Sequence, residues 1–398
     1  MIGRAVSLRW MENPDQWPMP ASPAIATLRR ELESDPGAID RFLSAHEFPL
    51  AEPPLYTFVY RGRAEAVRLR HWVHGLPASQ PFERLGSSDL WVRTLELPDD
   101  SRVEYKFEIV RDGGSHWEED ALNPNRARDP FGANSVVAAR GYVVPEWALE
   151  DPDVPRGEFD ELLIESAAFG EPRRVGVYRP AGYRESRRYP LLVVHDGDDY
   201  LEYASLRAVL DNLIYRLELP GLIVALLHPE RRLNEYAADE RHPRFVVDEL
   251  LPRLEGAYPL IELPESRGLM GASLGAVAAL QCALARPSVF GRLLLQSGSF
   301  AFTDIGENQR GPVFEPIVAM VNAFRAAPTR PADRIFVSVG RYESLVAENR
   351  ALVPVLRSTG ADVRFVEVRD GHNWENWRDR LRVGLSWLFP GPLWMVYE

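Results

Sequence analysis

Short apolar runs alternate with longer segments of helical periodicity throughout the second half of the chain. We expect strands at residues 174–178, 190–194, 222–227, 267–270, 292–296, 335–339 and 363–368, and helices at 206–217, 245–254, 346–359 and 374–388. Strands that alternate with helices pair in parallel, because each helix carries the chain back across the sheet. The pattern therefore predicts that residues 161–398 form an α/β domain with a mostly parallel, doubly wound sheet.

The preceding residues follow a different pattern. Alternating polar and apolar residues, many of them aromatic, occur at residues 55–60, 66–72, 90–97 and 103–110, and a turn-rich stretch leads to a last strand at 136–138. Such spacing is typical of an all-β sandwich. We expect an immunoglobulin-like sandwich domain over residues 51–145. Residues 1–50 would be an N-terminal extension with one helix near 23–45, and the proline-rich residues 146–160 would be a linker.

Composition excludes several classes of function. Asp and Glu number 58 against 46 Lys and Arg, so the formal net charge is −12. An acidic chain suits neither non-specific nucleic-acid binding nor anionic membrane surfaces. Neither a signal peptide nor an apolar run of spanning length is recognisable, which favours the cytoplasm. The single cysteine, Cys282, excludes an intrachain disulfide and is expected to be a small core residue. No oligomeric state is predicted.

Ser273 stands in the pattern Gly271-Ala272-Ser273-Leu274-Gly275, between a predicted strand and a predicted helix of small residues. This context is typical of the nucleophile elbow of an α/β-hydrolase. Small residues beside the serine leave room for a strained turn that lifts its hydroxyl above the sheet. Ser273 is therefore predicted to be a nucleophile, and the Leu274 N–H an oxyanion donor. The alternative is an ordinary strand–turn–helix junction with an incidental serine.

A nucleophilic serine needs a base, and His372 is the only histidine that follows Ser273 in the chain. It comes directly after the last predicted strand, where α/β-hydrolases place this residue. Glu343 is the first carboxylate after the preceding strand, and we expect it to orient the imidazole and stabilise its charged form. Two alternatives remain: His372 could cap the last helix, and Glu343 could be a solvated loop residue beside a Ser–His dyad.

The second oxyanion donor should come from the loop after the predicted strand 190–194. That loop begins with His195 and contains Gly197, Asp198 and Asp199, and the N–H of Gly197 or Asp198 is the expected donor. Neither this loop nor any other segment has the ligand spacing of a zinc or calcium motif, so no metal or cofactor is expected. His228 and His242 would lie either at the pocket mouth or on the surface.

Several of these segments resemble the enterochelin (enterobactin) esterase family. The matching pieces are residues 270–276, 295–300 and 195–200, together with Gly371-His372-Asn373-Trp374-Glu375-Asn376-Trp377-Arg378, which is similar to the family's G-H-x-W-x-x-W-R pattern. The front half is similar as well, at residues 90–91, 105–107 and 129–135. The resemblance covers nearly the whole chain. It implies a serine esterase that cleaves the ester bonds of a cyclic tri-catecholate siderophore, ferric or free, in the cytoplasm.

Departures from the family bear on the substrate. The family often has tryptophans where this chain has Ala301 and Phe302, and the oxyanion loop carries acids at 198 and 199. Arginines would have to compensate these acids if the substrate is a ferric trianion. We expect substrate contacts from Arg232, Arg341, Trp374, Phe300 and His195. Arg378 is a further cation that could compensate the acids. For Trp377 we favour a packing role over a contact with substrate.

Two other functions remain open. A feruloyl-type or acetyl-type carbohydrate esterase, or another small-molecule carboxylesterase, would use the sandwich domain to bind glycans, with Trp72, Trp91 and Trp117 as the sugar platform. A protein without activity would use the hydrolase domain as a scaffold only. The complete set of serine, histidine and acid disfavours the second of these.

Overall fold

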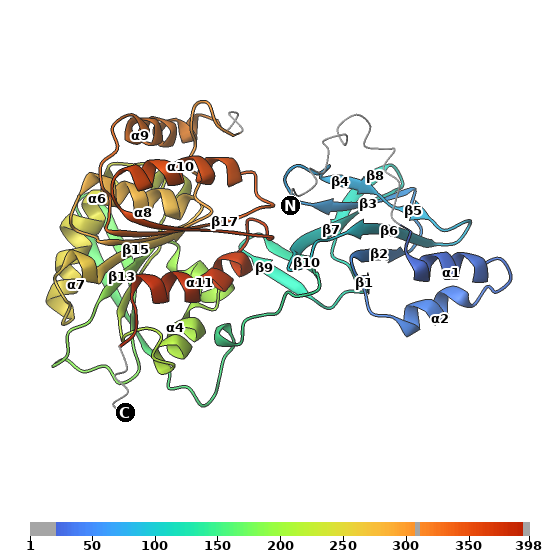
Figure 1. Ribbon diagram of the computed structural model, residues 1–398, viewed down its shortest axis with the longest axis horizontal. Helices are drawn as coiled ribbons and strands as arrows, with labels where there is room; N and C mark the ends of the chain where they lie inside the picture. The colour runs from blue at the N-terminus through green and yellow to red at the C-terminus, as the bar shows by residue number, and fades with distance from the viewer. Residues whose placement is uncertain (1–20, 307–310, 393–398) are drawn as a thin grey trace, which may run out of the picture. The chain divides into compact units, whose positions relative to one another are not determined.

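The computed structural model describes residues 21–306 and 311–392. The chain divides into two compact units, one of residues up to 143 together with 369–371, and one of the remaining residues from 144 onward. Figure 1 shows strands in the first unit and a sheet covered by helices in the second. Of the helices in the described ranges, none combines the length and the hydropathy of a membrane span.

The N-terminal unit contains two antiparallel sheets. The first has the order β1-β2-β6-β5, and the second has the order β4-β3-β7-β10-β9, with β8 paired to β7. Phe58 of β2 and Tyr105 of β7 meet edge to face at 4.7 Å, so the two sheets share an aromatic core. The strands are β1 (Leu50–Glu52), β2 (Leu55–Arg61), β3 (Ala66–His71), β4 (Ser79–Pro81), β5 (Glu83–Arg84), β6 (Leu90–Glu96), β7 (Arg102–Arg111), β8 (Gly114–Glu118), β9 (Arg126–Asp129) and β10 (Gly132–Ala138).

The helical segment before the sandwich differs from the prediction. Two helices, α1 (Pro23–Glu31) and α2 (Ala38–Ala45), replace the single helix expected near residues 23–45. The break contains Pro36 and Gly37, which disfavour a continuing helix. Both helices share one hydrophobic cluster with strands β1, β2 and β6. They therefore belong to the core of the N-terminal unit.

The C-terminal unit contains one eight-stranded sheet of order β11-β12-β14-β13-β15-β16-β17-β18. Strands from β14 to β18 in this order are parallel, whereas β11 and β12 are antiparallel to their neighbours. The mostly parallel sheet is therefore confirmed. The strands are β11 (Glu158–Ser166), β12 (Glu171–Arg179), β13 (Leu191–Val194), β14 (Ile223–Leu227), β15 (Arg267–Ala272), β16 (Arg292–Gln296), β17 (Arg334–Gly340) and β18 (Asp362–Val368).

Helices cover both faces of this sheet. On β13, Leu191 and Val193 join one hydrophobic cluster and Leu192 and Val194 join the other. The first cluster includes residues of α7 (Leu251–Ala257), α8 (Leu274–Ala285), α9 (Glu315–Ala326) and α10 (Val346–Ser358). The second includes residues of α3 (Gly197–Tyr203), α4 (Leu206–Tyr215) and α11 (Trp374–Leu388). Doubly wound packing follows from this alternation of buried side chains along each strand.

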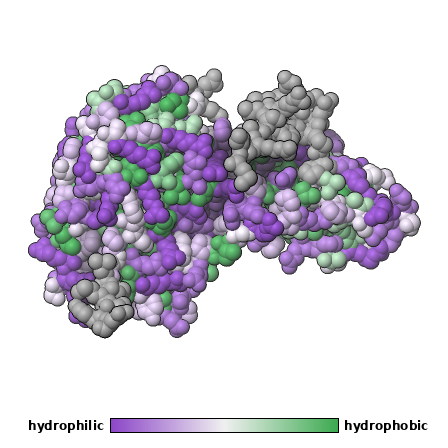
Figure 2. All heavy atoms as spheres, in the orientation of Figure 1, coloured by the Kyte–Doolittle hydropathy of each residue, from purple (hydrophilic) through white to green (hydrophobic). Residues whose placement is uncertain are grey.

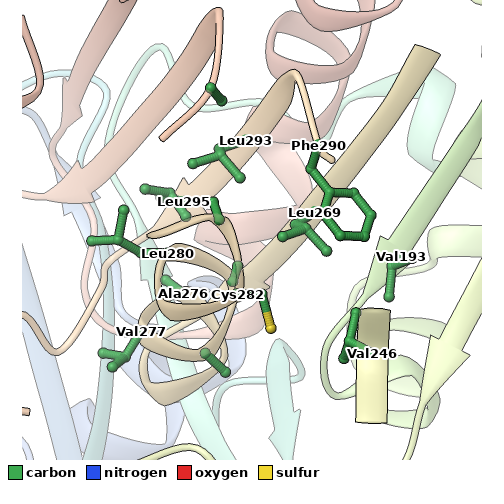
Figure 3. Packing of buried hydrophobic residues seen from close by; sticks show 14 of the residues in the cluster. Val193, Val246, Leu269, Ala276, Val277, Leu280, Cys282, Phe290, Leu293 and Leu295 are labelled. Carbon is green, nitrogen blue, oxygen red and sulfur yellow. The ribbon is translucent and has the colours of Figure 1, made fainter. Parts of the chain in front are cut away.

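Cys282 lies in the first cluster, fully buried on α8, as predicted (Figure 3). The segment Phe245–Leu250 is π-helical and lies within the helix predicted at residues 245–254. It follows the short helices α5 (Arg232–Glu235) and α6 (Arg241–Arg244) and leads into α7. On the outside, the C-terminal unit is largely hydrophilic in the view of Figure 2, with small separate hydrophobic patches.

The segment predicted to be a linker is ordered within the C-terminal unit. Trp147 is buried in the second hydrophobic cluster, and its carbonyl accepts a hydrogen bond of 2.9 Å from Asn212 on α4. Residues from Glu158 onward already form β11, an edge strand with an exposed Leu163. The prolines led to the prediction of a linker, because a linker and an irregular segment packed on a core have similar composition.

Candidate active site

The Ser273 turn has the geometry of a nucleophile elbow. It follows β15 directly and precedes α8, and its backbone angles are φ 56° and ψ −119°. A positive φ is uncommon for a non-glycine residue and indicates strain that the surroundings hold in place. A Cβ atom on Gly271 would lie 2.3 Å from the backbone of Gly275, so a side chain at 271 is excluded. The glycine pattern read from the sequence thus has a steric cause.

The residues around Ser273 hold its backbone and contact its hydroxyl. Its N–H donates to the Gln296 carbonyl at 2.9 Å, and its own carbonyl accepts from the Ser299 N–H at 3.2 Å. The Oγ atoms of Ser273 and Ser299 are 3.3 Å apart. Sequence reasoning missed Ser299. The only signal was its position after a buried parallel strand, at the carboxyl edge where such sites gather.

His372 and Glu343 are in direct contact. His372 lies in the loop between β18 and α11, and its Nδ1 is 2.7 Å from Oε2 of Glu343, which follows β17. The Glu343 side chain is fully buried, whereas the His372 side chain is 37% exposed. A buried carboxylate is stable only when donors surround it. The pairing predicted for these two residues is present, and their catalytic roles stay predictions.

Three further donors hold the other oxygen of Glu343. Its Oε1 accepts from the Ser297 hydroxyl at 2.6 Å, the Gly340 N–H at 2.7 Å and the Asn376 amide at 3.3 Å. Oε2 is thereby left to face His372. Glu343 therefore cannot rotate without losing several hydrogen bonds, which fixes the orientation of the imidazole it contacts.

Trp377 sets the direction of one of these hydrogen bonds. Its indole N–H donates to Ser297 Oγ at 2.9 Å, and indole nitrogen can only donate. The Ser297 hydroxyl must then donate its own proton to Glu343. The ring of Trp377 also meets the His372 ring edge to face at 5.0 Å. Ser297 and Asn376 were not predicted, and Trp377 was expected only to pack; its spacing from His372 was the available signal.

The loop after β13 lies against the elbow. A Cβ atom on Gly275 would be 3.1 Å from Asp196 Oδ2 and 3.2 Å from His195 Cβ. Gly197 begins α3, and a Cβ atom there would lie 2.4 Å from Leu226 Cβ, so this position requires glycine. The first N–H groups of a helix have no partner within it. The structure thus brings together the two helix N-termini that carry the predicted oxyanion donors, Leu274 on α8 and Gly197 or Asp198 on α3.

The acids of this loop differ in their surroundings. Asp196 accepts two hydrogen bonds of 2.8 Å from Arg232, and Asp198 lies 2.6 Å from Arg174 and 2.8 Å from His228. Burial, reinforced by the nearby Asp196 carboxylate, raises the pKa of Asp199 to about 6.

Two predicted substrate contacts are wrong because the side chains are fully buried. Phe300 belongs to the hydrophobic cluster beneath α8 and is 0% exposed. His195 is 0% exposed as well, with Nδ1 on the Met270 carbonyl at 2.9 Å and Nε2 on His242 Nε2 at 3.0 Å. Burial lowers the pKa of His195 to about 4, so its ring is neutral at physiological pH. His242 is buried too, and it therefore lies neither at the mouth of a substrate pocket nor on the surface.

The three arginines expected near the substrate each form an ion pair within the protein. Arg232 is bound to Asp196, Arg341 lies 3.4 Å from Glu367, and Arg378 lies 2.9 Å from Asp379. Trp374 is 7% exposed and packs on Tyr200 and Trp377. These arginines are therefore already paired with carboxylates of the protein, and the Trp374 indole is mainly a core residue.

His195, His242 and Cys282 form a buried cluster whose potential ligand atoms lie within 4.8 Å of one another. Metal–nitrogen bonds of about 2.1 Å and metal–sulfur bonds of about 2.3 Å hold two ligand atoms at most about 4.4 Å apart. The two imidazoles already contact each other through their Nε2 atoms. Burial raises the pKa of the Cys282 thiol, which keeps it protonated. The cluster fits a packed hydrogen-bonded core.

The esterase character has independent support from known proteins. The family model of "Putative esterase" matches residues 166–388. The chain belongs to this family. It is therefore a carboxylic ester hydrolase, and the matched range includes Ser273, Glu343 and His372.

Named relatives bear out the family resemblance. The chain is 27% identical to the iron(III) enterobactin esterase of Dickeya dadantii (strain 3937), over 78% of this chain and 80% of that protein. It is 25% identical to that of Escherichia coli (strain K12), over 77% and 81%. The crystal structure of the enterochelin esterase from Shigella flexneri has the same fold, with a TM-score of 0.67 and 24% identity over 84% of this chain and 92% of the other.

Proposed function

We propose that this esterase hydrolyses the ester bonds of a catecholate siderophore of the enterobactin type. The observation that carries the proposal is the length of its similarity to iron(III) enterobactin esterases, which covers about four fifths of each chain. A match confined to the catalytic unit would fit any esterase of the family. Similarity that also includes sequence ahead of residues 166–388 favours a common substrate class.

Ser273, His372 and Glu343 are the proposed catalytic residues. His372 Nε2 takes the proton of the Ser273 hydroxyl while Oγ attacks the ester carbonyl carbon. The Leu274 N–H and the N–H of Gly197 or Asp198 stabilise the negative carbonyl oxygen. His372 then returns the proton to the departing alkoxide, and water hydrolyses the acyl-enzyme by the same route.

The hydroxyl of Ser273 must move for this reaction. In the free enzyme its Oγ lies 3.3 Å from Ser299 Oγ. Catalytic hydrogen bonds are often long or misaligned before the substrate binds. We propose that Ser273 exchanges the Ser299 contact for His372 Nε2 in the substrate complex.

Three further proposals accompany this function. The sandwich ending near residue 143 has immunoglobulin-like topology, the catalytic domain begins near residue 144 and includes the segment predicted to be a linker, and hydrolysis takes place in the cytoplasm. The substrate is a small molecule, and neither nucleic acid nor membrane is a partner. In a ferric substrate, the iron belongs to the substrate and is not a cofactor of the protein.

A substrate panel tests the proposal. The purified chain and its Ser273→Ala and His372→Ala variants are incubated with an enterobactin-type trilactone, feruloyl esters and p-nitrophenyl acetate, and products are separated by chromatography. We expect linear catechol-serine products from the native chain and a loss of at least about 10³-fold in both variants. Intact trilactone beside rapid cleavage of feruloyl or p-nitrophenyl esters would exclude the siderophore function and favour the carbohydrate-linked or small-molecule alternative.

A further inference from the structure

A pocket of about 660 Å³ lies in the C-terminal unit, between residues 301–303 and the first turns of α9. Its volume is within the range of about 300–1,000 Å³ that holds small organic ligands. The residues that matter for its chemistry are Ala301, Phe302, Phe314, Glu315, Val318 and Asn322.

The first lining residue of the pocket, Ala301, lies two residues along the chain from Ser299, which contacts the candidate nucleophile. Ser299 Oγ is 3.3 Å from Ser273 Oγ, and the Ser299 carbonyl accepts from the Ala301 N–H at 2.9 Å. Ala301 and Phe302 then form one wall of the pocket. A substrate whose ester carbonyl lies at Ser273 can therefore place a neighbouring arm in this space.

The walls suit an aromatic ring. Phe314 supplies a partly exposed flat apolar surface and Val318 a branched one, whereas Phe302 lines the same pocket with a side chain that is almost fully buried. Asn322 adds a polar edge, where its amide donates to Thr303 Oγ1 at 2.6 Å. Aryl rings favour stacked or edge-on contacts with such side chains.

The described lining of the pocket carries one negative charge. Of the described residues that line it, Glu315 alone is ionisable. One cation beside the pocket, Arg325, lies over the Phe302 ring at 5.0 Å and is bound by Asp304 at 2.8 Å and by Asn322 Oδ1 at 3.0 Å. A carboxylate accepts hydrogen bonds from phenolic hydroxyls and repels phenolates.

We infer that this pocket receives a protonated dihydroxyaryl arm of the ester, so that the enzyme prefers the iron-free siderophore to its ferric complex. The inference rests on the proposed function. Phenols keep their protons at neutral pH, as tyrosine does with a pKa of about 10, whereas catechols bound to Fe³⁺ have lost theirs. The iron-free arm can donate to Glu315. The ferric complex is a trianion, which the carboxylate opposes.

Coulomb's law sets the expected size of the preference. Three negative charges at about 8 Å from one carboxylate lower binding about tenfold even at the dielectric constant of water. Salt weakens the effect, because the Debye length is about 8 Å at physiological ionic strength.

The test compares kcat/KM for the iron-free trilactone and for its ferric complex at low ionic strength. We expect the native chain to prefer the iron-free form by at least about tenfold. Glu315→Gln should move this ratio about tenfold toward the ferric form, and Glu315→Arg about a hundredfold. Glu262→Arg is the matched control. It makes the same change in net charge at an exposed side chain that is not among the lining residues of the pocket, and it should leave the ratio unchanged.

A second variant tests occupancy of the pocket. Val318→Trp fills the space, and we expect the KM for the iron-free trilactone to rise at least about tenfold, with thermal unfolding checking that the variant is folded. A native preference for the ferric complex, or an unchanged KM in Val318→Trp, would overturn the inference and leave the siderophore function standing. Hydrolysis of neither form, with p-nitrophenyl acetate still cleaved, would overturn both.

Discussion

At the scale of single residues, the site depends on how the acid is held. Glu343 has no freedom, because Ser297, Gly340 and Asn376 occupy one of its oxygens and His372 the other. The hydrogen bonds from Trp377 to Ser297 and from Ser297 to Glu343 run in one direction only. In the mechanism that we propose, Ser297 and Trp377 are positioning residues that act through Glu343.

Ser297→Ala should lower kcat by about tenfold to a hundredfold, part of the 10²–10⁴ that a positioned base contributes. It leaves the buried Trp377 N–H without its acceptor and removes one donor from Glu343. KM should stay the same, because no substrate contact is lost. Steady-state kinetics with p-nitrophenyl acetate measures both values.

Ser297→Thr should restore most of the rate, since it keeps a hydroxyl at this place. Ser358→Ala, which removes an exposed hydroxyl from the end of α10, serves as the matched control. An equal loss in Ser297→Thr and Ser297→Ala would argue that packing, and not the hydrogen bond, is what matters.

At the scale of elements, the site is a product of parallel strands that end at one edge. Ser273 follows β15, Ser297 follows β16, the Glu343 loop follows β17 and the His372 loop follows β18. These four strands are neighbours in the sheet. Residues distant in sequence are thereby brought within hydrogen-bonding distance, as the topology of parallel sheets requires.

The elbow has no room for a side chain at Gly271. Gly271→Ala should destabilise the chain by about 1–3 kcal/mol and abolish activity, because the new Cβ meets the Gly275 backbone at 2.3 Å. A backbone atom cannot rotate away as the end of a side chain can. Thermal unfolding reports the change as a shift of about 2–4 °C per kcal/mol.

Gly256→Ala provides the contrast. Gly256 lies in α7, and its added Cβ would meet nothing within 4 Å, so the change should stabilise the helix by about 0.5–1 kcal/mol. A stable and active Gly271→Ala variant would refute the steric explanation of the glycine pattern.

At the scale of the whole molecule, the chain consists of two units with separate cores. The N-terminal cluster joins α1 and α2 to the first sheet, and the two clusters of the C-terminal unit lie on either side of its own sheet. Separate cores imply that damage to one unit need not spread to the other.

Phe42→Ala should therefore destabilise the N-terminal unit selectively. Phe42 on α2 is 7% exposed, and removal of a buried phenylalanine costs about 3–5 kcal/mol. We expect calorimetry to show one transition at lower temperature, with cleavage of p-nitrophenyl acetate at 25 °C unchanged. Phe131→Ala, at a position 96% exposed, should change neither. Loss of esterase activity in Phe42→Ala alone would contradict the independence of the two cores.

The sequence alone determined the features that depend on local pattern. Strand and helix periodicity predicted the mostly parallel sheet, because side-chain burial repeats along each element. The glycines around Ser273 predicted the strained turn, because only small residues fit there. Chain order singled out His372 and Glu343, which the structure places in contact.

Only the tertiary structure decided the features that depend on distant neighbours. The burial of Phe300 and His195, the pairing of Arg232 with Asp196, and the hydrogen bonds of Ser297 join segments far apart in sequence. Composition has no information about such pairings, since a buried histidine and an exposed one are written alike. The packed segment around Trp147 and the edge strand β11 were missed for the same reason. A strained turn is a property of adjacent residues, whereas a paired or buried charge is a property of the folded molecule.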